Sequence, residues 1–179
     1  MTAISLDTFR ALVAEARLAP SVHNIQPSRW RLADGHVELL GDTGRVIPVA
    51  DPAGRDWRIS HGTALEGFDL ALRARGLQLG AVEPQPEQGP ARGALMPIAR
   101  AAIIGGATSS APEVVRTRMT WRGGFRADGA TDAAALDRLA GLRDDMILVR
   151  ERAAVAGIAR LGDEAGLHFL REDDHRAEL

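Results

Sequence analysis

Residues 16–30 read ARLAPSVHNIQPSRW, and this stretch separates two patterns of different period. Alternating apolar and polar residues follow it on both sides of Asp34-Gly35, which predicts a β-hairpin. Before it, apolar residues recur at three- and four-residue steps and predict an amphipathic helix with Ser5 as N-cap and Pro20 beyond its end. The residues of this helical stripe are Leu6, Phe9, Leu12, Val13 and Ala16.

A second helix is predicted from about 57 to 75, and Gly76 ends it. Its buried side comprises Ile59, Leu65, Phe68 and Leu72. Strands are predicted at 77–82 and 100–105. Since the AAII core of the latter is apolar at every position, we expect this strand to be covered on both faces.

The last third of the chain is predicted to be largely helical. A capping box at Ser110 to Glu113 starts a helix over 112–119, and Thr131 caps a short helix that runs to 139. A strand at 146–149 and a helix over 151–170 follow. The predicted fold class is α+β, with helices packed on a mixed, mostly antiparallel sheet.

Composition narrows the range of functions. The 179 residues are 45% hydrophobic and 26% charged, as in a folded globular protein, and they include no cysteine. The net charge of −2, without a basic stripe, gives no support for a nucleic-acid partner. No apolar run is long enough to span a bilayer and no basic leader is present, so we expect a cytoplasmic protein. No Cys/His spacing indicates a metal, and no serine-hydrolase elbow indicates a nucleophile.

The opening stretch contains Ala19-Pro-Ser21-Val-His-Asn24-Ile-Gln26-Pro27. This segment resembles the A-P-S-x-x-N-x-Q-P signature of the nitroreductase-like FMN flavoproteins. In that family the segment lies along the flavin, so the resemblance assigns cofactor contacts to Pro20, Ser21 and Asn24. Amide and hydroxyl side chains suit the polar edge of a flavin, and proline fixes the backbone that presents them. Without the resemblance, a helix-ending loop whose Asn and Gln satisfy backbone groups explains the same residues.

A second cluster, VVRTRMTWRGGF at 114–125, is similar to the phosphate element of the same family. The resemblance implies that Arg118 and Thr120 hold the FMN phosphate and that Arg122 faces the flavin pyrimidine. Arginine can grip a phosphate through two N–H donors. The solvated face of a short helix is the alternative explanation of these arginines. Trp30, Trp57 and Trp121 are expected in the core or in a lid, and His23 is expected to be structural.

The two elements occur in the order of the fused, two-half members of the family, the Acg type. The segment Asp51 to Leu65 also resembles that subgroup. The resemblance implies a first half over 1–107 and the start of an incomplete second half over 108–179, so that a homodimer or a missing C-terminal half completes the site.

The function implied by the resemblance is NAD(P)H-dependent reduction of a nitroaromatic or quinone-like acceptor through FMN, with NADH or NADPH as donor. The flavin supplies the chemistry, so no catalytic side chain and no metal are expected. Two alternatives stay open. One is a flavin-binding or storage protein without turnover, and the other is a flavin-free truncated subunit that acts as an interaction protein.

Overall fold

The computed structural model describes residues 2–85, 94–109, 111–120, 123, 133–142 and 144–178. The chain divides into two compact units. The first comprises residues 1–119 together with 178–179, and the second comprises residues 120–177.

The first unit is built on an antiparallel sheet. Strands β1 (Ser28–Ala33), β2 (His36–Asp42), β5 (Leu95–Gly105) and β3 (Leu77–Leu79) lie side by side in the order β1-β2-β5-β3. A two-residue strand β4 (Glu83–Pro84) also pairs with β5. Every pairing among the described residues is antiparallel, so the α+β class is confirmed, whereas no parallel pair of the expected mixed sheet is found there.

The predicted hairpin is confirmed by its turn. Asp34 has φ 50° and Gly35 has φ 73°, and positive φ at both central residues belongs to the turn that matches the twist of a hairpin. Ala33 pairs with His36 across this turn, and Trp30 pairs with Leu39 further along. The turn chemistry therefore sets the register of β1 on β2.

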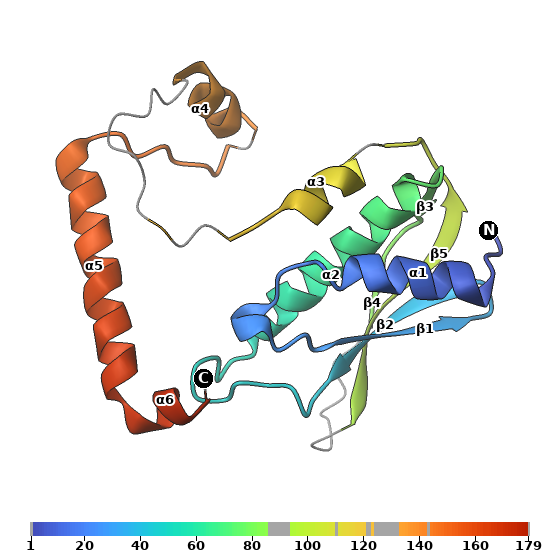
Figure 1. The fold of residues 1–179 in the computed structure, drawn as a ribbon, viewed down its shortest axis with the longest axis horizontal. Coiled ribbons are helices and arrows are strands. Elements are labelled where there is room, and N and C mark those ends of the chain that lie inside the picture. The colour runs from blue at the N-terminus through green and yellow to red at the C-terminus, as the bar shows by residue number, and fades with distance from the viewer. Residues whose placement is uncertain are drawn as a thin grey trace. The chain divides into compact units, whose positions relative to one another are not determined.

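Helices α1 (Leu6–Ala16) and α2 (Arg55–Arg73) cover one face of the sheet (Figure 1). Ser5 caps α1 as predicted, because its Oγ accepts a hydrogen bond from the Thr8 backbone N–H at 3.1 Å. At the ends of the two predicted apolar stripes, Leu6 and Ile59 are exposed, which corrects the expectation that they are buried. The core comprises Phe9, Leu12, Ala16, Val37, Phe68, Ala71, Leu72 and Ile103.

Strand β5 differs from its prediction. It is longer than expected, and Ala101 and Ile103 are buried while Ala102 and Ile104 are only half-buried. The expectation of cover on both faces is wrong for this strand as described, because α1 and α2 pack on the face that carries Ile103. A uniformly apolar run does not distinguish a strand covered on one face from one covered on two.

Helix α3 (Ala111–Thr117) belongs to the first unit and packs against α2. The expected boundary between the two halves at 107/108 lies before α3, whereas contacts divide the chain after Met119. The assignment of two family halves stays a prediction. Ser110, the predicted cap of α3, lies outside the described residues.

The second unit contains α4 (Ala133–Ala140), α5 (Arg152–Arg171) and most of α6 (Asp173–Glu178). Glu151 caps α5, since its carboxylate accepts hydrogen bonds from the backbone N–H groups of Ala153 and Ala154. The strand predicted at 146–149 is wrong. This segment is irregular, Ile147 is almost fully exposed, and no described strand pairs with it. Thr131, the predicted cap of α4, lies outside the described residues.

No described helix has both the length and the apolar composition needed to cross a bilayer.

Candidate functional site

The segment from Ala19 to Pro27 lies against α2, whose hydroxyl side chains hold it. The buried Ser60 Oγ accepts a hydrogen bond from the Val22 backbone N–H at 3.0 Å. The Thr63 Oγ1 donates to the Pro20 carbonyl at 2.6 Å. Ser60 and Thr63 lie about one helical turn apart on α2, and they therefore hold the backbone at both ends of the segment from Pro20 to Val22, where η1 (Val22–Asn24) begins.

The backbone of this segment is strained. His23, Asn24 and Gln26 have φ values of 43°, 57° and 46°, in the left-handed region that side chains other than glycine rarely adopt. Each such residue costs roughly 1–3 kcal/mol and persists only where the surroundings impose it. Here the Ser21 Oγ accepts from the Gln26 N–H at 3.0 Å, and the Arg45 Nη1 donates to the Ile25 carbonyl. Strain of this kind is concentrated at functional sites, which makes the segment a candidate site.

Two of the predicted cofactor residues, Pro20 and Arg118, line one pocket of about 340 Å³. They lie 98 positions apart in the chain, and packing of α3 on α2 brings them together. The Arg118 Nη2 donates to the Leu18 carbonyl at 3.3 Å, directly before the strained segment. The pocket volume lies at the lower end of the range for small-molecule sites.

The other predicted cofactor residues have different surroundings. Ser21 is half-buried, and its hydroxyl accepts the hydrogen bond from the Gln26 backbone N–H described above. Asn24 is exposed, and its Oδ1 accepts from the Gln26 Nε2 at 3.4 Å. Thr120 is exposed and belongs to the second unit. Arg122 lies outside the described residues, as does Trp121.

The residues around the pocket suit a ligand with an apolar face and an anionic group. Pro20, Leu70 and Val115 offer apolar walls, and Arg118 offers a cation. A Cβ at Gly62 would have no atom within 4 Å, so there is open space beside α2 where Gly62 lines the pocket. Glu66 also lines the pocket and brings the opposite charge. These groups fit flavin mononucleotide in kind, with Arg118 for its phosphate and the apolar walls for its ring, whereas Asn24 does not line this pocket.

His61 is the buried titratable side chain closest to this segment along α2. Its ring is 1% exposed, and its Nδ1 is hydrogen-bonded to the Ser28 Oγ at 2.8 Å. Burial lowers the pKa of His61 to about 4, so the ring is neutral near pH 7. It packs edge-on against Trp57 inside the fold, and it does not line the pocket of Pro20 and Arg118. The described residues contain no cluster of three or more metal-ligating side chains.

Trp30 and Trp57 were expected in the core or a lid. Trp57 is buried, and Trp30 is half-buried with its ring stacked on Phe68 at 4.7 Å. The clamping role of Ser60 and Thr63 was not predicted, because the sequence carries no signal for contacts between α2 and a loop about 40 residues earlier.

Comparison with known proteins gives similarity over part of the chain. Over 75 residues, 42% of this chain, it is 37% identical to "Putative NAD(P)H nitroreductase acg" of Mycobacterium tuberculosis. It is 38% identical over 72 residues to a second protein of that organism, "Putative NAD(P)H nitroreductase Rv3131". The matches span 23% and 21% of those two proteins, less than a quarter of their length. No protein-family model matches the chain.

Among solved structures, the chain is similar to one from Exiguobacterium sibiricum described as a "putative nitroreductase in complex with FMN". The TM-score is 0.43 and the identity is 16%, over 69% of this chain and 85% of the other.

Proposed function

We propose that the chain is an FMN-binding oxidoreductase of nitroreductase type. NADH or NADPH would serve as electron donor and a nitroaromatic or quinone-like compound as acceptor. The observation that carries the proposal is the pocket shared by Pro20 and Arg118, two residues that separate motifs had assigned to one cofactor. The sequence similarity to proteins named as NAD(P)H nitroreductases supports the same reaction class.

In this proposal the side chains bind and orient the cofactor. Arg118 holds the phosphate, Pro20 and Val115 contact the ring system, and the Asn24 amide satisfies the ring's polar edge. The hydroxyls of Ser60 and Thr63 keep the strained turn in the conformation that presents these groups. Bound FMN supplies hydride acceptance and electron transfer, so no side-chain nucleophile is required.

The first test compares Arg118→Ala with Arg116→Ala. Arg116 carries the same charge two positions earlier and already pairs with Glu15 and Glu113, at 3.1 and 3.2 Å. Loss of a charge-assisted phosphate contact is worth about 1.5–3 kcal/mol, so R118A should weaken FMN binding roughly 10- to 100-fold. R116A should stay within about threefold of the unmodified protein. Equilibrium titration of FMN fluorescence measures both constants, and equal affinity of R118A and the unmodified protein would refute the phosphate assignment.

A second variant tests the pocket without changing charge. In Gly62→Leu the new side chain occupies space that is open in the structure, so it should block FMN while leaving the urea midpoint of unfolding close to that of the unmodified protein. If G62L binds FMN as tightly as the unmodified protein does, the FMN site is not this pocket.

Bound FMN that neither NADH nor NADPH reduces would favour the storage protein, and absence of FMN binding would favour the interaction protein.

A further inference from the structure

A second cavity, of about 550 Å³, lies between α1 and β1. Arg10 reaches it from α1 and Arg17 from the C-cap position directly after that helix, and their spacing of seven residues puts them on one face with Val13. Arg29 reaches it from β1 and Arg45 from the loop after β2. Four of its nine lining residues are therefore arginines, and none is acidic.

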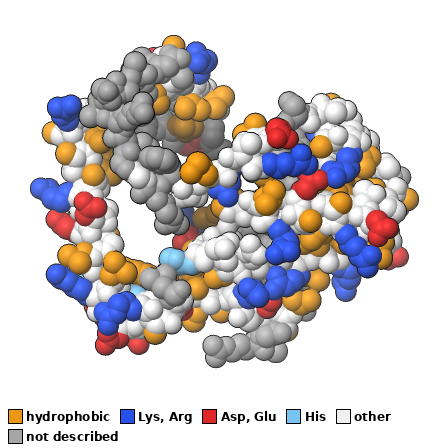
Figure 2. Space-filling view, viewed as in Figure 1, with side chains coloured by type: hydrophobic (Ala, Val, Ile, Leu, Met, Phe, Trp, Pro, Cys, Tyr) orange, Lys and Arg blue, Asp and Glu red, His pale blue; other side chains and the backbone are white. Residues whose placement is uncertain are grey.

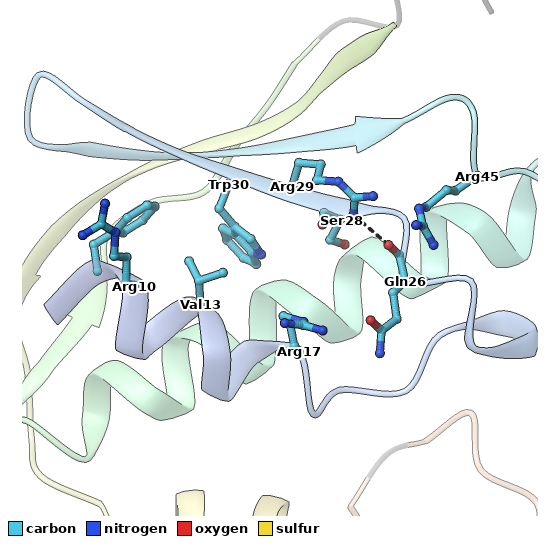
Figure 3. A pocket seen from close by; sticks show the side chains of 9 residues that line it. Arg10, Val13, Arg17, Gln26, Ser28, Arg29, Trp30 and Arg45 are labelled. Carbon is cyan, nitrogen blue, oxygen red and sulfur yellow. Dashed lines mark hydrogen bonds between the residues drawn. The ribbon is translucent and has the colours of Figure 1, made fainter. Parts of the chain in front are cut away.

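Figure 3 shows how these side chains are arranged. Val13 and Trp30 lie between Arg10 at one end and Arg17, Arg29 and Arg45 toward the other. Trp30 is stacked on the fully buried Phe68, which fixes its ring as part of the wall. On the outer surface, basic side chains gather over α1 and β1 with hydrophobic ones between them (Figure 2). Cationic groups thus surround an apolar wall that contains an aromatic ring.

The carboxylates nearby only partly balance this charge. Asp42 pairs with Arg29 at 2.8 Å and lies 3.7 Å from the Arg45 Nε, and Asp7 pairs with Arg10 at 3.3 Å. Arg17 has no carboxylate partner within 4.0 Å in the described part of the chain. Two carboxylates therefore face four guanidinium groups. Like charges in a concave site repel one another and raise the local concentration of anions.

The arginines differ in how firmly they are held. The Arg29 guanidinium also donates to the carbonyls of Gln26 and Ser28, at 2.9 and 3.0 Å, and so supports the backbone entering β1. Arg45 donates one bond to Ile25. A guanidinium has five N–H donors, so Arg45 keeps donors beyond that bond, and the Arg17 side chain at the end of α1 donates to no residue in the described ranges. The groups fit for contact with a ligand are Arg17 and Arg45, with Arg10 at the far end.

We propose that this cavity binds a small aromatic anion, a compound in which an aromatic ring carries a phosphate or carboxylate. The ring would contact Val13, Phe9 and Trp30, and the anionic group would accept hydrogen bonds from Arg17 and Arg45. The site shares no residue with the pocket of Pro20 and Arg118, and the proposal does not depend on flavin binding.

The test measures binding of phenyl phosphate by isothermal titration calorimetry, with inorganic phosphate and phenol as partial ligands. Phenyl phosphate should bind more tightly than either, and Arg17→Ala should weaken it roughly tenfold or more. Arg31→Ala is the matched control, because Arg31 lies on β1, pairs with Glu38 and does not line the cavity. R31A should stay within about twofold of the unmodified protein. Arg10→Ala is a second variant in the cavity. Because Arg10 is exposed and lies at the far end, R10A should weaken phenyl phosphate binding less than R17A does.

Three results would overturn the proposal. Inorganic phosphate that binds as well as phenyl phosphate would show that the apolar wall contributes nothing. Equal losses in R17A and R31A would show that only the general charge of this face matters. A loss of phenyl phosphate binding in R118A as large as that in R17A would show that the two sites are one. Unchanged phenyl phosphate binding in R118A, on the other hand, separates this site from the flavin proposal.

Discussion

At the scale of single residues, His61 shows what burial does to an ionisable group. Its Nδ1 is hydrogen-bonded to Ser28, whereas its Nε2 has no hydrogen-bond partner among the described residues and lies against Gly41 and the Trp57 ring. Protonation of both ring nitrogens would place a positive charge in this apolar surrounding. Burial therefore lowers the pKa of His61 to about 4 from the ordinary value of 6.5.

This shift predicts a loss of stability in mild acid. Below pH 6.5 the unfolded chain takes up a proton at His61 that the folded chain refuses until about pH 4, so stability falls as the pH drops through this window. The contribution of His61 amounts to about 3 kcal/mol at most. Urea unfolding of the unmodified protein and His61→Gln, from pH 7 to pH 4, measures it. The difference between the two should shrink toward acid pH, and parallel pH profiles would contradict the account.

At the scale of elements, two glycines of the sheet differ in the space that a Cβ atom would have. A Cβ on Gly41 of β2 would lie 2.4 Å from the Trp57 Cη2 and 2.9 Å from the His61 Nε2, so α2 packs against a strand that has room only for glycine there. A Cβ on Gly105 of β5 would have no atom within 4 Å.

Gly41→Ala should therefore destabilise the protein by about 1–3 kcal/mol, the usual cost of overpacking a core. Gly105→Ala should be neutral or slightly stabilising, because it limits the unfolded chain without a clash. Thermal unfolding of both variants measures the contrast. Similar melting temperatures for the two would show that α2 and β2 are less closely packed at Gly41 than described.

Elements defined by local chemistry could be predicted from the sequence. The Ser5 cap, the Asp34-Gly35 turn and Gly76, with φ 69°, each mark a boundary through neighbouring residues alone. Features that depend on distant partners could not be predicted in this way. The apolar run in β5 did not reveal that one face is half-exposed, and residues 146–149 have strand composition but no described strand pairs with them.

The candidate site was predictable to a similar extent. Motifs named Pro20 and Arg118, and the structure places both in one pocket. The cavity of Arg10, Arg17, Arg29 and Arg45 has no motif, because its members come from a helix, a strand and a loop. Only the seven-residue spacing of Arg10 and Arg17 was visible in the sequence.

At the scale of the whole molecule, the buried hydrophobic residues among those described all lie between Phe9 and Ile103, in the first unit. Helix α5 of the second unit has no buried residue, and Leu161 on it is 63% exposed. Stability should therefore depend strongly on the first unit.

Phe68→Ala should cost about 3–5 kcal/mol, since it empties a fully buried site against Trp30. Leu161→Ala should change stability by less than about 0.5 kcal/mol, as an exposed substitution does. Urea unfolding followed by tryptophan fluorescence compares them. A large loss in L161A would mean that α5 is covered in solution.

FMN binding by this chain can be measured on the purified protein itself. The chain is incubated with FMN, separated from free FMN by gel filtration, and its visible absorption spectrum is recorded. Flavin absorption should co-elute with the protein at about one FMN per pocket, and this absorption should be lost in R118A but not in R116A. A protein fraction without flavin, whatever its oligomeric state, would contradict the account.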